Sequence, residues 1–365
     1  MKAKKISAEI VADSISPQGH RITTFLLTYP RFIHAEVMTH RLFSRNTASS
    51  RAIPFNKMVK SIEEDPFIPI VWQKDHKGMQ GSEYWTEKDI LIPYSDESYE
   101  IEAVRHMYNE WLAGRDYAIA CASELNKHGL TKQLCNRMLE PYMWHTALVT
   151  ATEWENFLDL RCPRYKTSGL ATPTVRSRKE WIEIMNFSSV STQCPQTEEE
   201  WWSLSESGAE IHIQALAEAI YDSLKENIPE ELKEGEWHIP FNKRIEFEEL
   251  DINSAIKVAV ARCARLSYMT FDGKIDPEKD IKLHDDLLES KHFSPFEHCA
   301  RVMSLEEIMS FIKGEMDTIE IDEVGPNSIV ASNEIWNDSK ENAWCNNFRG
   351  FIQYRYLIEH PWINY

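Results

Sequence analysis

The strongest constraint on the fold is a pair of β-prone runs near the start of the chain. Residues 7–16 alternate loosely between apolar and polar side chains and end at the turn signal Pro17-Gln18-Gly19. Residues 22–29 (ITTFLLTY) are rich in β-branched and aromatic side chains and meet Pro30. Together the two runs predict a β-hairpin, which makes an antiparallel sheet the starting point of the fold.

Helices are predicted to follow the hairpin and to pack on its sheet. Apolar residues at near-helical spacing indicate a long amphipathic helix over 97–127. Thr152 and Glu155 have the form of a capping box, which predicts a helix over 153–161. Residues 55–95 are expected to be mostly loop, because prolines interrupt the periodicity. Further patterns predict helices over 31–38, 131–141, 209–224, 254–266 and 276–290.

The expected fold class is α+β, an antiparallel sheet packed with long helices. Prolines interrupt residues 162–207, and we interpret this range as an insertion. The acidic stretch 225–236 is the best candidate for a linker. The predicted division is a catalytic core part (1–161), the insertion (162–207), a closing helix with an acidic linker (208–240) and a second core part (241–365).

The composition argues against several classes of protein. A formal net charge of −18 over 365 residues argues against a general nucleic-acid binder, because the protein would repel a polyanion. The seven cysteines form no CxxC pair, which excludes a zinc ribbon and makes a reducing compartment the default. No apolar run approaches the roughly 18 residues of a membrane span. We therefore expect a cytoplasmic protein with no membrane and no nucleic-acid partner.

Common catalytic and metal-binding motifs are also missing. Neither GxGxxG nor GxxxxGK followed by Ser or Thr occurs, so no Rossmann or P-loop site is indicated. Cys194 precedes Pro195, but no His or Arg stands beside it in the sequence to lower the pKa of its thiol. His34 and His40 lack HExxH spacing and have one acid nearby, so no metal site is expected.

Residues 39–51 (THRLFSRNTASSR) are the most informative stretch for function. They carry three arginines, one histidine and six short hydroxyl or amide side chains. Guanidinium forks bind phosphate and carbonyl oxygens bidentately, and short donors satisfy the remaining lone pairs. Residues 31–60 hold six Lys or Arg and one acid, Glu36, in an otherwise acidic chain. The stretch predicts an anion-binding loop, with an ordinary solvated basic face as the alternative.

The order of residues within this stretch resembles a family signature. His40-Arg41, seven residues and then Ser49 are similar to the flavin-dependent thymidylate synthases, whose motif is Arg-His-Arg, seven residues and Ser. A second block that resembles the family is Arg137 together with residues 156–161. A third, residues 260–268 and 292–298, resembles the beginning of an ordinary family member but here follows the basic motif. The resemblance therefore implies the family fold with a circularly permuted chain.

The resemblance also implies the chemistry and the site. FAD reduced by NADPH would supply a hydride, and methylenetetrahydrofolate would supply the carbon that converts dUMP to dTMP in a homotetramer, without a metal. Arg161 would favour the N3-deprotonated uracil, and Ser49 would lie beside the nucleotide. The residues implied in dUMP binding are Glu36, Thr47, Ala48, Ser49, Ser50, Arg51, Arg137 and Arg161. Those implied in FAD and folate binding are Thr39, His40, Arg41, Asn156, Ser267, His292, Ser294 and Glu297.

Three departures from the family motif bear on this reading. Thr39 stands in place of a flavin-contacting arginine, Glu36 in place of a glutamine, and Thr47 in place of a glutamate. The C-terminal residues Arg349, Gln353 and Arg355 are candidates to replace the lost donors. Two alternative functions stay open: a hydroxymethylase of a deoxypyrimidine monophosphate that uses the same folate, and a non-catalytic nucleotide-binding protein that lost its flavin.

Overall fold

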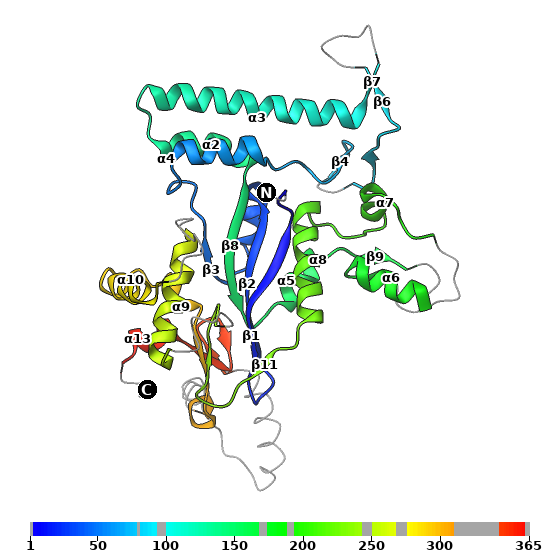
Figure 1. The fold of residues 1–365 in the computed structure, drawn as a ribbon. Helices are drawn as coiled ribbons and strands as arrows, with labels where there is room; N and C mark the ends of the chain where they lie inside the picture. The colour runs from blue at the N-terminus through cyan, green and yellow to red at the C-terminus, as the bar shows by residue number, and fades with distance from the viewer. Residues whose placement is uncertain are drawn as a thin grey trace, which may run out of the picture.

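The computed structural model of the protein describes residues 3–78, 81–92, 100–167, 174–187, 193–242, 250–267, 276–309 and 343–361. A central sheet lies between two layers of helices (Figure 1). One face is covered by α5 (Glu155–Arg161) and α8 (Ile211–Glu226), and the other by α9 (Ile252–Ser267), which is backed by α10 (Pro277–Glu289). This mixture of helix and sheet is consistent with the α+β class predicted from the sequence.

The sheet has the strand order β11-β1-β2-β8-β3. Its strands are β1 (Ser7–Ile15), β2 (Arg21–Pro30), β8 (Trp144–Ala151), β3 (Ser44–Thr47) and β11 (Glu230–Glu231). β1 and β2 form the predicted hairpin, and Gly19 in its turn has a φ of 87°, which favours glycine. The strands from β1 to β3 are antiparallel, whereas β11 joins the edge in parallel.

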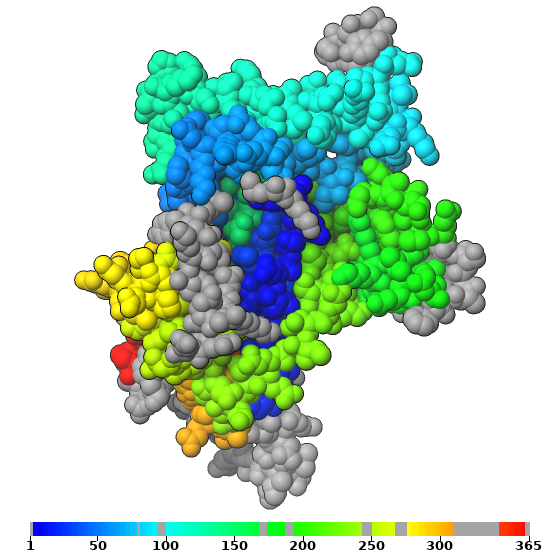
Figure 2. Space-filling view, viewed as in Figure 1, coloured from blue at the N-terminus to red at the C-terminus, as the bar shows by residue number. Residues whose placement is uncertain are grey.

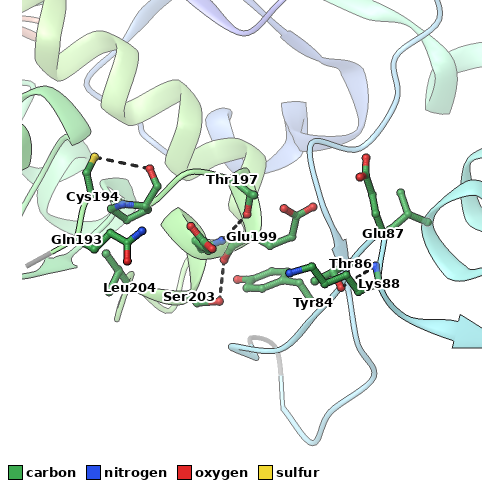
Figure 3. Close-up of a pocket in the computed structure, with 13 residues that line it drawn as sticks. Tyr84, Thr86, Glu87, Lys88, Gln193, Cys194, Thr197, Glu199, Ser203 and Leu204 are labelled. Carbon is green, nitrogen blue, oxygen red and sulfur yellow. Dashed lines mark hydrogen bonds between the residues drawn. The ribbon is translucent and has the colours of Figure 1, made fainter.

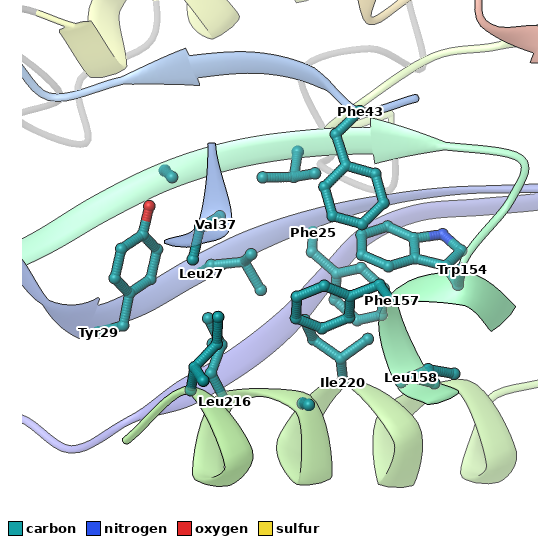
Figure 4. Packing of buried hydrophobic residues seen from close by; sticks show 14 of the residues in the cluster. Phe25, Leu27, Tyr29, Val37, Phe43, Trp154, Phe157, Leu158, Leu216 and Ile220 are labelled. Carbon is teal, nitrogen blue, oxygen red and sulfur yellow. The ribbon is translucent and has the colours of Figure 1, made fainter. Parts of the chain in front are cut away.

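The central strand β2 is buried on both faces of the sheet. Alternate side chains of β2 meet aromatic and aliphatic groups around α5 and α8, as Figure 4 shows for Phe25, Leu27, Tyr29, Trp154, Phe157 and Ile220. The intervening residues, Thr24 and Leu26, face the α9 side, because side chains alternate along a strand. A continuous β-prone run with three threonines therefore fits a strand that has no solvent-exposed face.

A buried chain of hydrogen bonds crosses the α9 face of the sheet. Ser14 Oγ lies 2.9 Å from His238 Nδ1, and His238 Nε2 lies 2.8 Å from Thr24 Oγ1. Thr24 Oγ1 lies 2.8 Å from Thr150 Oγ1, which in turn lies 2.8 Å from His298 Nδ1. All five residues are buried. These hydrogen bonds join three strands of the sheet, β1, β2 and β8, to two later segments of the protein.

A separate helical layer lies above one end of the sheet (Figure 1). It consists of α2 (Phe55–Glu64), α3 (Ala103–Lys127), α4 (Lys132–Cys135) and the 3-10 helix η2 (Asn136–Tyr142). In the space-filling view, the N-terminal strands in blue lie beneath this layer, between the green helices and the yellow ones (Figure 2). Helix α3 runs along the outside of the layer and buries only Ala103 and Ala122 fully.

The remaining elements are short. They are η1 (Arg31–Ile33), α1 (His34–Val37), β4 (Trp72–Gln73), β5 (Tyr84–Trp85), β6 (Ile90–Leu91), β7 (Ile101–Glu102), β9 (Tyr165–Lys166), β10 (Thr174–Val175), α6 (Arg178–Phe187), α7 (Glu198–Ser203), β12 (Trp237–His238), η4 (Ser294–Glu297), β13 (Ala300–Val302), β14 (Trp344–Cys345), β15 (Phe348–Arg349), β16 (Phe351–Gln353) and α13 (Tyr354–Glu359). Within the described ranges, no helix combines the length and apolar character that crossing a membrane requires.

Several predicted helices are confirmed, and two expectations are wrong. Residues 55–95 lie mostly outside helices and strands where the structure describes them, as expected, but they begin with α2, which buries Met58 and Ile62 one turn apart and precedes the prolines. The long helix begins at Ala103 because residues 101–102 pair as β7 with β6. Thr152 does not cap α5, because its hydroxyl accepts the backbone N–H of Arg349 instead.

Residues from 162–207 form a small core beside α8 together with Val71 and Tyr84. Tyr165, Trp181 and Trp202 are buried together there, and Ile211 at the start of α8 joins them. Arg178 donates to both carboxylate oxygens of Glu198, at 2.8 and 2.7 Å, and lies 4.8 Å from the Trp202 ring centre. The division of the chain into an insertion and two core parts stays a prediction.

The buried histidines predict an acid-sensitive fold. Burial lowers the pKa of His238 to about 4, and burial together with neighbouring His238 lowers that of His298 to about 3. Both have the ordinary value of about 6.5 in the unfolded chain, which therefore binds more protons below that pH. We expect the free energy of unfolding to fall as the pH drops from about 6.5 towards 4, by about 1.4 kcal/mol per pH unit for each histidine.

Urea denaturation at several pH values measures this effect. His298→Gln should make the acid dependence shallower, because one fewer proton distinguishes the folded from the unfolded chain. The control is His128→Gln, since His128 is exposed at the end of α3. Equal slopes for His298→Gln and wild type would contradict the expectation.

Candidate functional site

The basic stretch contributes one strand and two flanking loops at the edge of the sheet. Within it, His40 is buried between two aromatic rings, stacked 5.7 Å from Phe43 and edge-on 4.8 Å from Phe157. Burial and the charges of Arg161 and Arg45 lower the pKa of His40 to about 4. The imidazole is therefore neutral at pH 7, and one of its ring nitrogens can accept a hydrogen bond.

Arg161 supplies that hydrogen bond from the end of α5. Its Nε donates to His40 Nε2 at 3.2 Å, and its Nη2 lies 3.5 Å from Thr39 Oγ1. Thr39 Oγ1 itself donates to Glu36 O at 2.6 Å. One edge of the Arg161 guanidinium is thus held by residues 39 and 40, and its Nη1 makes no hydrogen bond in the described part of the chain. Two blocks of the sequence, 121 residues apart, meet at this contact.

The loop after β3 is fixed to the turn that carries Arg137. Asn136 donates to Ser50 O at 2.7 Å and to Ile53 O at 2.9 Å, and the Ser50 hydroxyl donates to Glu140 at 2.5 Å. These bonds bring the segments of Arg51 and Arg137 together. Both arginine side chains are exposed, and neither forms an ion pair within the described ranges.

The other residues implied in nucleotide binding differ in what they can offer. Thr47 pairs with Ala147 in the sheet, and the backbone N–H of Ala48 donates to Thr146 O at 3.0 Å, so this N–H is not available to a phosphate. Ser49 is half-buried and its hydroxyl has no partner among the described residues. Glu36 has a buried carboxylate oxygen, Oε2, that lacks a hydrogen-bond partner there. Ser49 and Glu36 therefore have polar side-chain atoms without a hydrogen-bond partner among the described residues.

The C-terminal cluster, residues 346–355, lies against the basic stretch 39–51. Asn347 Nδ2 donates to Leu42 O at 2.9 Å, and Gln353 Nε2 donates to Ser44 Oγ at 3.2 Å and to Asn347 Oδ1 at 2.6 Å. Gln353 is buried, and its Oε1 accepts from Asn346 at 3.0 Å. The side chain of Gln353 is therefore fully used in holding the two segments together.

The two arginines of this cluster pair with carboxylates. Arg349 lies 3.2 Å from Glu153, and Arg355 donates to Glu297 at 2.6 Å and to Glu359 at 3.1 Å. Neither hydrogen-bonds to residues 39–41 within the described part of the chain. Their role as replacements for the missing arginine stays a prediction.

The residues implied in flavin and folate binding are spread around the same edge. Ser294 and Glu297 lie in η4, which packs against β3 and α9. Arg41, Asn156 and His292 are exposed, and no hydrogen bond joins their side chains to the rest of the site in the described structure. Ser267 is the last residue of α9, and its side chain lies outside the described residues.

Sequence reasoning missed two residues of this edge. Asn347 is recognisable only from its partner Leu42, more than 300 positions away. Arg45 lies inside the basic stretch but has no role in the family motif. Its guanidinium Nη1 donates to Met38 O at 2.9 Å and to His40 O at 3.3 Å.

A cavity of about 760 Å³ lies in another part of the molecule (Figure 3). It is lined by Tyr84, Thr86, Glu87, Lys88, Val104, Gln193, Cys194, Pro195, Thr197, Glu199, Glu200, Ser203 and Leu204. Lys88 is the one Lys or Arg among these lining residues, beside three glutamates, so the lining does not form a basic site for an anion. Among the described residues, no group of three or more His, Cys, Asp or Glu side chains could hold a metal ion.

Comparisons with known proteins give weak similarities only. No protein-family model matches the sequence, and no curated protein matches it. Among solved structures, a UMP/dUMP methylase PolB from Streptomyces cacaoi bound with 5-Br UMP is 14% identical with a TM-score of 0.37, over 60% of this chain and 89% of that chain. The same methylase bound with 5-Br dUMP is 14% identical with a TM-score of 0.34, over 60% and 90%. The proposal for function therefore rests on the residues themselves.

The hydrogen bonds of Gln353 predict a measurable contribution to stability. Gln353→Leu removes the donors to Ser44 and Asn347 and leaves buried polar partners unsatisfied, which should lower the free energy of unfolding by about 1–3 kcal/mol. Urea denaturation measures the change. The control is Gln133→Leu on α4, where the side chain is exposed. Equal stability of the two variants would show that the C-terminal cluster does not hold the basic stretch.

Proposed function

We propose that the protein methylates dUMP to dTMP, with FAD reduced by NADPH and with methylenetetrahydrofolate as the carbon donor. The observation that carries this proposal is the contact of Arg161 with His40 and Thr39. The two sequence blocks that resemble flavin-dependent thymidylate synthases were identified separately, and the fold joins them through side chains. A solvated basic face would not require an arginine from a distant helix to dock on a buried neutral histidine.

The third sequence block supports a circular permutation of the family fold. Helix α9 packs against β3 and β8, and η4, which contains Ser294 and Glu297, packs against β3. In this chain these elements follow the basic motif, yet they lie beside it in space. We infer that the segments of the family fold occur in a different order along this chain but pack against one another in the same way. Joining two termini that lie close together on the surface leaves the packed contacts intact.

Arg161 has the chemistry needed to activate a pyrimidine ring. The fixed positive charge would stabilise a ring deprotonated at N3, and that negative charge makes C5 more nucleophilic. Neutral His40 orients the guanidinium by accepting from Nε, which leaves Nη1 for the ligand. The unpartnered Oε2 of Glu36 would accept a hydrogen bond from the nucleotide.

Ser49, Arg51 and Arg137 would hold the nucleotide phosphate. Arg51 and Arg137 are exposed cations without carboxylate partners in the described structure, on two segments that Asn136 ties together. We propose that a homotetramer covers these exposed side chains, because a site that excludes water strengthens the interactions of its charges.

The flavin and folate would lie between the basic stretch and η4. The donor set fits an anionic, planar cofactor: Arg41 and Asn156 offer unused donors, and Glu297 and Ser294 lie on the adjoining turn. When bound, FAD supplies the hydride that completes the methyl group. No glycine-rich turn is needed if side chains hold the cofactor.

Product analysis tests the proposed reaction. Purified protein is incubated with dUMP, methylenetetrahydrofolate, NADPH and FAD, and the nucleotides are identified by mass spectrometry. We expect dTMP, and a yellow protein that retains flavin. A hydroxymethyl product without dTMP would instead identify a hydroxymethylase, and nucleotide binding with neither flavin nor product would identify a non-catalytic binding protein.

Arg161→Gln should reduce kcat/KM for dUMP by about 100-fold or more, because it removes a charge that acts on the developing anion. The matched control is Arg164→Gln. Arg164 is exposed three residues later, and its guanidinium donates to Asp159 O at 3.2 Å. The control should stay within about twofold of wild type. Equal losses in both variants would remove Arg161 from the site.

A further inference from the structure

Arg45 is a half-buried cation without a carboxylate partner in the described structure. It projects from β3, and its Nη1 donates to the carbonyl oxygens of Met38 and His40, on either side of Thr39. Its Nε and Nη2 form no hydrogen bond with the described part of the chain. Three of the five N–H donors of the guanidinium are therefore unused within the candidate site.

Several other partly buried arginines of the protein, although not Arg161, are neutralised by a carboxylate. Arg21 lies 2.6 Å from Asp13, Arg301 pairs with Glu307 at 2.5 Å, and Arg355 pairs with Glu297 at 2.6 Å. Taking a charge out of water costs free energy unless a partner compensates it. Arg45 is an exception to this pattern, and an anionic ligand would supply the compensation.

The surroundings of Arg45 preserve its positive charge. Burial lowers the pKa of Arg45, and Glu297 and Tyr29 act in the opposite direction. Burial and the nearby arginines lower the pKa values of His34 and His40 to about 4, so both rings are neutral at pH 7. Glu297 is a carboxylate that acts on Arg45, and it already accepts from Arg355. Arg45 therefore remains a positive charge without a carboxylate partner near Thr39.

We propose that Arg45 binds a phosphate group of the ligand in this site and replaces the positive charge that is missing at Thr39. The role rests on the proposed function only in the identity of the ligand, because the unpaired guanidinium is a property of this chain. Two sources of phosphate fit: the pyrophosphate of FAD and the monophosphate of dUMP. The Nε and Nη2 groups would form the charge-assisted bonds, while Nη1 keeps its bonds to the backbone.

Binding measurements with the full-length protein test this role. Dissociation constants for FAD, dUMP and inorganic pyrophosphate are measured by calorimetry at low and moderate salt, for wild type, Arg45→Gln, Thr39→Arg/Arg45→Gln and the control Arg164→Gln. We expect Arg45→Gln to weaken the phosphate ligand by about 10- to 100-fold and to reduce the salt dependence of its binding. The double variant should recover most of the affinity, because exposed position 39 can carry the guanidinium.

The alternative is that Arg45 only caps the carbonyl oxygens of Met38 and His40. Arg45→Gln would then lower the melting temperature and leave the affinities of the folded protein unchanged, and Thr39→Arg would restore nothing. That result overturns the proposal. An effect on FAD alone or on dUMP alone supports it and identifies the source of the phosphate.

Three further outcomes keep the test decisive. If wild type binds dUMP or pyrophosphate but not FAD, the flavin reaction fails while the effect of Arg45→Gln on those two ligands still decides the role of Arg45. If folded wild type binds none of the three, the phosphate site is wrong. If Arg45→Gln does not fold, Thr39→Arg in the otherwise unchanged chain replaces it. Tighter pyrophosphate binding then supports an anion site, and unchanged binding overturns it.

Discussion

The structure depends on pairing the threonine hydroxyls that the central strands of the sheet bury beneath α9. Thr24 and Thr150 lie on neighbouring central strands and face α9, where an unpaired hydroxyl would cost free energy. His238 and His298 satisfy them, and these histidines come from two later segments of the chain, β12 and the residue that follows η4. The same bonds that satisfy these hydroxyls therefore fix both segments in place, next to the edge where the candidate site lies.

Short sequence patterns predicted the elements that are stabilised by residues close together in the sequence. The hairpin follows from two β-prone runs and a glycine turn, and α10 begins where Asp276 caps it by accepting from Lys279, with Pro277 at its first position. The sequence did not reveal that Thr152 would leave its own helix uncapped. Its hydroxyl accepts a hydrogen bond from the backbone N–H of Arg349, which is 197 residues away in the sequence.

The candidate site shows the same limit. Motif spacing could predict that His40 and Arg161 belong to one site, because each lies in a block with its own order. It could not predict that they bond to each other, since that depends on a neutral imidazole and hence on burial by Phe43 and Phe157. Arg45 was hidden for a related reason. An arginine indicates an anion site only when the structure shows that no carboxylate pairs with it.

The edge position of β3 explains how a site can be assembled from distant segments. An edge strand has one side on which no other strand pairs with it, and β3 is such a strand. Side-chain amides, and not another strand, form the hydrogen bonds that connect this part of the chain to distant segments. Asn46 donates to Cys263 O at 3.3 Å, and Asn347 reaches Leu42. These contacts are non-covalent, so they need the segments to be close in space and not in any particular chain order. A permuted chain can therefore build the same edge, and a charge can move from position 39 to strand β3 without disturbing the buried core.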